Sequence, residues 1–134
     1  IDAQDNPHLP HNYEKNCVAY TGTHDNNTLF GWLWEILPHQ RQYALDYCHF
    51  AGDNWQEGGY ESPACRAIIA ALWQSSAGLV LVPFQDLCGF GKDTRMNVPG
   101  VAQDNWAYRI TQENLNRMDV DWLREMNVLY KRIR

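Results

Sequence analysis

Residues 18–28 read VAYTGTHDNNT. The run opens with apolar, β-prone residues, turns at Gly22, and places His24 and Asp25 side by side where a strand should end. Polar residues follow as far as Thr28, which can cap a helix. In chains that alternate strands with helices, barrels and open sheets build their sites at this kind of strand-to-helix junction. We therefore expect the functional site of the chain to lie here.

A second apolar run, LVLVPF at residues 79–84, predicts the strongest strand of the chain, and residues 17–20 predict the other. Both runs are apolar throughout, which is typical of strands buried on both faces of a parallel sheet, so the second is expected to be central. Its proline cannot donate to a ladder and should mark the end of the strand. Gln85 and Asp86 follow, and residues 89–105 then form a loop of a length that is usually functional.

Helical periodicity occupies the interval between the two strands and the C-terminal part of the chain. Helices are predicted over 29–37 after the Thr28 cap, over 39–50, after the Ser62-Pro63 cap, and after Asp119. Helical crossovers between two apolar strands imply a parallel pair. Two parallel strands have open edges, and a closed barrel of this class takes about 250 residues. The sequence thus predicts an incomplete α/β fold, and its open strand edges predict self-association.

The composition limits the partners and the compartment of the protein. The chain has 134 residues, 45% of them apolar, and its formal charge of −5 includes no block of like charges. Nucleic acids and anionic membranes require clustered Lys and Arg, so neither is an expected partner. The four cysteines show no metal-type spacing, no apolar run approaches the roughly 20 residues that span a bilayer, and residues 1–5 lack signal-peptide features. We expect a cytoplasmic protein with reduced cysteines.

Several separated motifs carry a resemblance to a known family. Residues 20–28, YTGTHDNNT, resemble the signature after the seventh barrel strand of the amylomaltases, which are 4-α-glucanotransferases (disproportionating enzymes) of the α-amylase superfamily. PFQD at 83–86, Gly91 and RMNVPG at 95–100 resemble the segment after the eighth strand, and NWAYR at 105–109 completes the match. The resemblance implies an α/β fold that is the C-terminal fragment of a TIM (β/α)8 barrel, with about two parallel strands and flanking helices. The whole chain, 1–134, would be one segment of the catalytic barrel.

The resemblance also implies an activity. It is the retaining transfer of α-1,4-glucan segments between maltooligosaccharides by double displacement, with no metal and no cofactor. The family's nucleophilic Asp and acid/base Glu follow earlier strands, and no segment here matches them, so the chain alone is expected to be inactive. Asp25 would be the third carboxylate, which stabilises the transition state, and His24 would donate to a sugar hydroxyl. Asn97, Arg95 and Gln85 are the expected substrate-binding residues.

The residues by themselves leave structural alternatives open. Asp25 has no neighbouring Lys or Arg, which favours a functional acid, but an Asp here is also suited to capping the next helix. Asn97 can bind glucose hydroxyls or hold its own loop, and Arg95 can anchor a loop or a carboxylate. Asp86 can pair with Arg95 or cap a turn. Trp106 can stack on a sugar, although we expect it in the core.

Two other classes of function compete with the glucanotransferase. A non-catalytic carbohydrate-binding module would use Trp and Tyr as stacking platforms, but such modules are mostly all-β, whereas this chain has long helical stripes. A metal-dependent hydrolase built on His24 and Asp25 would need two or three further ligands, which the spacing does not supply. We therefore take the glucanotransferase as the expected function and the binding module as its alternative.

Overall fold

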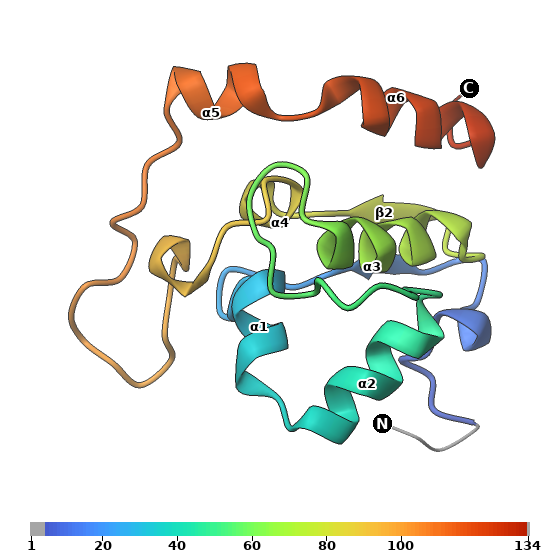
Figure 1. The fold of residues 1–134 in the computed structure, drawn as a ribbon, viewed down its shortest axis with the longest axis horizontal. Helices are drawn as coiled ribbons and strands as arrows, with labels where there is room; N and C mark the ends of the chain where they lie inside the picture. The colour runs from blue at the N-terminus through green and yellow to red at the C-terminus, as the bar shows by residue number, and fades with distance from the viewer. Residues whose placement is uncertain (1–4, 134) are drawn as a thin grey trace.

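The structure is a computed structural model that describes residues 5–133, and it has a mixed α/β fold (Figure 1). The expectation that residues 1–5 lack signal-peptide features concerns mainly residues 1–4, which lie outside the described residues. Within residues 5–133, no helix is long and apolar enough to cross a membrane. The elements in chain order are η1 (Pro10–Asn12), β1 (Val18–Tyr20), α1 (Leu29–Glu35), α2 (Pro38–Tyr47), α3 (Pro63–Gln74), β2 (Leu79–Leu81), α4 (Phe84–Leu87), η2 (Lys92–Thr94), α5 (Gln112–Arg117) and α6 (Val120–Leu129).

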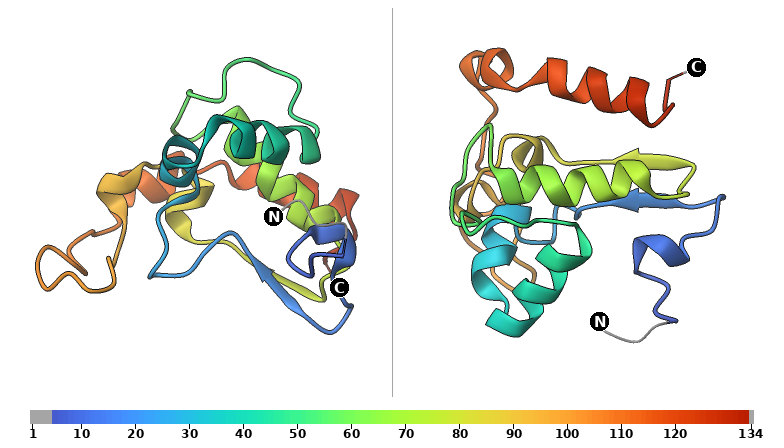
Figure 2. Two further views of the ribbon diagram at one scale, coloured as in Figure 1. Left: turned by 90° about the horizontal axis from the view of Figure 1, so that it is seen from below. Right: turned by 45° about the vertical axis from the view of Figure 1, so that its right-hand side comes forward.

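The two strands form the parallel pair that the sequence predicts. Val18 lies opposite Leu79, and the register continues to the pair of Tyr20 and Leu81. The connection runs through α1, α2 and α3, and α3 returns along the sheet (Figures 1 and 2). Both polar junctions therefore lie at the same edge of the sheet, because the carboxyl ends of parallel strands point the same way.

The prediction that both strands are buried on both faces is wrong for this chain. Ala19 is buried against Leu72 and Ala77, on the side of the sheet that α3 covers. Alternate side chains point to the other face, where no element lies among the described residues (Figure 2), so these side chains are about half exposed. The sheet has two strands within residues 5–133, so β2 is an edge strand there and not a central one. Self-association through these edges stays a prediction. The half-exposed side chains are Val18, Tyr20, Leu79 and Leu81.

The three predicted helix caps are confirmed. Thr28, Ser62 and Asp119 each accept a hydrogen bond from the main-chain amide three positions later, at 3.1, 3.4 and 3.0 Å. Such bonds satisfy amides that the first turn of a helix leaves without a partner. The start of α1, and with it the length of the loop that follows β1, is thus fixed by local chemistry.

Helix ends differ from the periodicity at two places. The helix predicted over 29–37 ends at Glu35, and Leu37 is exposed, because the residue before Pro38 is driven out of the helical region. The helix predicted over 39–50 ends at Tyr47. The chain then turns through His49, which has a φ of 59°.

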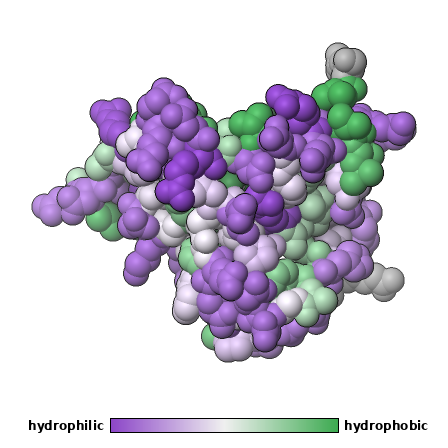
Figure 3. Space-filling view, turned by 45° about the horizontal axis from the view of Figure 1, so that its top comes forward, coloured by the Kyte–Doolittle hydropathy of each residue, from purple (hydrophilic) through white to green (hydrophobic). Residues whose placement is uncertain are grey.

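The core lies where α3 packs against α1 and α6. Leu29, Cys65, Ile69 and Met126 are buried together there, and the Trp73 indole donates to the Asn127 side chain at 2.9 Å. The apolar stripe of α6 is only partly covered, because the helix ends at Leu129 and its last turn carries exposed apolar side chains. Figure 3 shows apolar side chains exposed among polar ones on this side of the molecule. The exposed apolar residues of this segment are Val120, Val128, Leu129 and Ile133.

Arg132 closes the C-terminus of α3. Its guanidinium donates to the carbonyls of Trp73, Ser75 and Ala77 at 2.9 Å each, and to that of Leu72 at 3.4 Å. The last carbonyls of a helix have no partner within the helix and carry partial negative charge, so a cation there stabilises the end. Arg132 thus stabilises the end of a helix that lies about 60 residues earlier in the chain.

Replacing Arg132 by Met is therefore expected to lower the free energy of unfolding of the full-length protein by about 2 kcal/mol. The substitution keeps the apolar stem but leaves the carbonyls without their donor. Lys131→Met is the matched control, since that exposed side chain forms no hydrogen bond or ion pair within residues 5–133, and it should stay within about 0.5 kcal/mol. Equal urea midpoints for the two variants would show that the cap contributes nothing.

Candidate functional site

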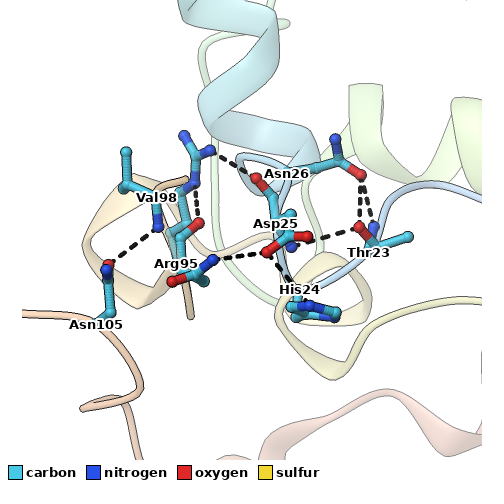
Figure 4. Close-up of polar contacts among 8 residues, drawn as sticks. Thr23, His24, Asp25, Asn26, Arg95, Val98 and Asn105 are labelled. Atoms are coloured by element: carbon cyan, nitrogen blue, oxygen red, sulfur yellow. Dashed lines mark hydrogen bonds and ion pairs between the residues drawn. The ribbon is translucent and has the colours of Figure 1, made fainter. Parts of the chain in front are cut away.

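The two polar junctions meet in space, as their topology requires. The loop between β1 and α1 lies against the segment after β2 and against residues 95–106, which we call the clamp loop (Figure 4). His24, Gln85 and Arg95 line a cavity of about 160 Å³ between these segments. Asp25 and Arg95 also border a larger groove of about 500 Å³ that continues along β1 towards α1 and α2.

Asp25 lies at the rim of this groove, and its side chain is 47% exposed. Its Oδ1 accepts a hydrogen bond from Asn97 Nδ2 at 2.6 Å and lies 3.2 Å from His24 Nε2. Its Oδ2 has no polar partner within residues 5–133, and no Lys or Arg side chain pairs with the carboxylate there. The alternative that Asp25 caps the next helix is wrong, because Thr28 makes that bond. The carboxylate is thus held by one oxygen and open at the other.

The clamp loop holds the main chain on both sides of this carboxylate. Arg95 Nη2 donates to the carbonyl of Asp25 at 2.7 Å, and Arg95 Nε donates to the carbonyl of Asn97 at 2.9 Å. The amide of Asn97 donates to the carbonyl of His24 at 3.1 Å. Two of the three predicted substrate-binding residues therefore contact Asp25 or its main chain directly. The third, Gln85, donates its side-chain amide to the carbonyl of Thr94 at 3.2 Å.

Asp86 anchors the loop between β1 and α1, a role that the sequence does not predict. Its carboxylate is buried and accepts hydrogen bonds from the Leu29 amide, at 2.8 Å, and from the Thr21 hydroxyl. Burial raises the pKa of Asp86, and the two hydrogen bonds lower it by less. The alternative in which Asp86 pairs with Arg95 is wrong, because that guanidinium is bound to main-chain carbonyls. Asp86 ties the two ends of the loop that carries His24 and Asp25.

Trp106 is not in the core, contrary to expectation. Its side chain is 54% exposed, and its indole lies 5.1 Å from the imidazole of His24, centroid to centroid, with the planes at 34°. Its backbone has a φ of 59°, which is uncommon for a bulky residue. The clamp loop thus brings an aromatic ring to the same residue pair that the sequence singled out.

The described residues offer no other obvious reactive centre. No group of three or more His, Cys, Asp or Glu side chains within residues 5–133 is arranged to hold a metal ion. The four cysteines are free, and burial raises the pKa of Cys48, Cys65 and Cys88 to about 11, so these thiols stay protonated at neutral pH.

Residues 1–115 match the family model of the 4-alpha-glucanotransferases. The chain belongs to this family. It is 39% identical over 134 residues to the chloroplastic/amyloplastic 4-alpha-glucanotransferase of Arabidopsis thaliana, covering 96% of this chain and 22% of the relative. It is 41% identical over 119 residues to the 4-alpha-glucanotransferase of Synechocystis, covering 88% and 21%.

A solved amylomaltase has the same fold in this region. The amylomaltase of Streptococcus agalactiae, in complex with acarbose, superposes with a TM-score of 0.81 at 29% identity. The match covers 95% of this chain and 24% of that enzyme, and the chain spans about a fifth of the length of the curated relatives. The predicted glucanotransferase family and the parallel α/β fold are confirmed. The predicted cytoplasmic location stays a prediction, since the Arabidopsis relative is described as plastidial.

Proposed function

We propose that this 4-alpha-glucanotransferase family member transfers α-1,4-glucan segments between maltooligosaccharides, and that Asp25 stabilises the transition state. One observation supports this most strongly. The carboxylate of Asp25 is fixed through Oδ1 by Asn97, while Oδ2 is open at the rim of a groove. A half-exposed acid with one open oxygen in such a place is available to a ligand.

The chemistry of retaining transfer gives this acid its task. Each of the two displacements passes through an oxocarbenium-like state, in which positive charge grows on the anomeric carbon and the ring oxygen of the sugar. A fixed carboxylate beside that charge stabilises the transition state more than the ground state, and only this difference accelerates the reaction. Because the clamp loop already holds Asp25, the carboxylate needs little reorganisation as the charge develops.

The neighbouring polar groups are suited to bind the sugar hydroxyls around Asp25. His24 is exposed, and with Nε2 beside Asp25 its Nδ1 can form a hydrogen bond with a sugar hydroxyl next to the one that Asp25 binds. Asn97 and Gln85 use their amide nitrogens within the protein, which leaves each carbonyl oxygen as an acceptor. Arg95 keeps Nη1 as a donor beside the two main-chain bonds of its guanidinium. We propose these four as substrate-contacting residues.

We further propose that residues 1–134 are the C-terminal portion of the catalytic barrel. The nucleophile and the acid/base would then come from other barrel strands. The open face of the sheet supports this proposal, because its exposed Val18, Tyr20, Leu79 and Leu81 are the residue types that further barrel strands and their core would bury.

The test is maltotriose disproportionation by the full-length protein. We expect glucose and longer maltooligosaccharides to appear while the number of reducing ends stays constant, because transfer exchanges glycosidic bonds without consuming water.

EDTA should have no effect on the rate, and the chain 1–134 alone should give no turnover, because it lacks two of the three acids. A steady rise in reducing ends would show a hydrolase instead. Turnover by the chain alone would contradict the assignment of the other acids.

A further inference from the structure

We propose that Trp106 is a positioning residue that holds the imidazole of His24 against Asp25. This inference rests on the proposed function of the His24–Asp25 pair. It is carried by the ring contact of 5.1 Å between Trp106 and His24, and by the His24 Nε2 to Asp25 Oδ1 distance of 3.2 Å. The indole packs against the imidazole, and Nε2 of the imidazole faces the carboxylate.

His24 has few other restraints on its side chain. Its carbonyl is fixed by the Asn97 amide, but its ring contacts only Asp25 and Trp106 by hydrogen-bonding or aromatic interactions within residues 5–133. An exposed imidazole without support samples several rotamers, in most of which neither ring nitrogen faces the carboxylate. Packing against the indole removes part of this freedom before any sugar arrives.

The backbone of the clamp loop is arranged to place the indole there. Trp106 has a φ of 59° and Asp104 a φ of 61°, and the left-handed region is unfavourable for a tryptophan. The strained turn is held by the Trp106 amide, which donates to the Met96 carbonyl at 2.6 Å. Asn105 bridges the same loop: its Oδ1 accepts from the Val98 amide at 3.0 Å (Figure 4), and its Nδ2 donates to the Val101 carbonyl at 2.7 Å.

Burial does not explain this strain, because more than half of the side chain is exposed. A tryptophan packed for stability would lie in the core, as we expected from the sequence. The turn instead directs the ring towards His24, which is why we assign the residue a positioning role and not a structural one.

The decisive experiment is a double-mutant cycle on His24 and Trp106 in the full-length protein, assayed with maltotriose. Trp106→Ala is expected to lower kcat about tenfold with little change in KM, and Trp106→Phe, which keeps a ring, should restore most of the rate. In the His24→Ala background, Trp106→Ala should have almost no further effect, because the residue acts through the imidazole. Trp34→Ala is the matched control, since Trp34 is 55% exposed and packs against Trp55, away from His24.

A second readout does not depend on catalysis. In protein labelled at the histidine rings, the His24 ring protons should show a ring-current shift that Trp106→Ala abolishes and Trp106→Phe keeps in reduced form. If the wild-type protein shows this shift but no transfer activity, the proposed function fails while the contact stands. Additive effects of the two substitutions on kcat would overturn the inference. So would a change confined to KM that persists in His24→Ala, since it would mean that the indole binds sugar directly.

Discussion

Asp25→Asn in the full-length protein is expected to lower the rate of maltotriose disproportionation by about a thousandfold or more. The amide has the same shape as the carboxylate, and its oxygen can still accept the hydrogen bond from Asn97 Nδ2. Its charge is lost, so it cannot offset the positive charge that develops on the sugar. Because ground-state binding relies on hydrogen bonds that the amide partly keeps, we expect the loss in kcat and only a small change in KM.

The control for Asp25→Asn is a second acid of the same neighbourhood. Asp104 lies on the clamp loop, is exposed, and has a φ of 61°, a conformation that Asn adopts readily. Asp104→Asn should therefore leave both the fold and the rate unchanged. The urea midpoints of both variants should match that of the wild type, since Asp25 forms no buried ion pair. Near-normal disproportionation by Asp25→Asn would remove the central role that we assign to this carboxylate.

The parts of the fold that could be predicted are those with local causes. The sequence predicts the caps Thr28, Ser62 and Asp119, because a short polar side chain before an apolar stripe satisfies amides only three residues away. The parallel pair followed from two apolar runs with helices between them. The position of His24 and Asp25 at the carboxyl edge of the sheet followed from that topology alone.

The contacts that complete the site could not be predicted, because they join residues far apart in the chain. Asn97 and Asp25 are 72 positions apart, and nothing in either local pattern says that their side chains meet. The sequence predicts Trp106 in the core, because an indole is largely apolar. Nothing in the sequence shows that a left-handed turn points this ring outward. Tertiary contacts of the clamp loop determine both the meeting of Asn97 with Asp25 and the exposure of Trp106.

Asp25 and Asp86 show most directly that the local sequence does not determine whether a side chain is buried. Both follow an apolar strand within a few residues, so their sequence contexts are nearly equivalent. One carboxylate is open at a groove and the other is buried. The difference arises because α4 begins at Phe84, which turns Asp86 inward beneath the neighbouring loop, whereas the first junction continues for several residues before α1 begins.

Asp86→Ala is accordingly expected to destabilise the full-length protein by about 3 kcal/mol, because it leaves the buried Leu29 amide and the Thr21 hydroxyl without their acceptor. The loop that carries Asp25 loses its anchor at both ends, so kcat should also fall, by about tenfold. Asp53→Ala, at an exposed position, is the control and should change neither quantity. Equal unfolding midpoints for the two variants would refute the anchoring role.

Asp86→Asn separates the hydrogen bonds of this anchor from its charge, because the amide oxygen can accept from Leu29 and the amide nitrogen can donate to Thr21. Burial raises the pKa of Asp86 in the folded state above its ordinary value of 3.8. Between the pKa values of the unfolded and the folded state, the folded protein therefore keeps a proton that the unfolded chain has released. The contribution of Asp86 to the free energy of unfolding is complete below pH 3.8 and declines as the pH rises through the pKa of the folded state. The amide does not titrate, so the stability of Asp86→Asn relative to the wild type should increase between acidic and neutral pH. Urea unfolding of Asp86→Asn and of the wild type, at acidic and at neutral pH, measures this difference in stability. A difference that stays constant or falls with pH would mean that desolvation of the carboxylate is not the dominant influence on its pKa.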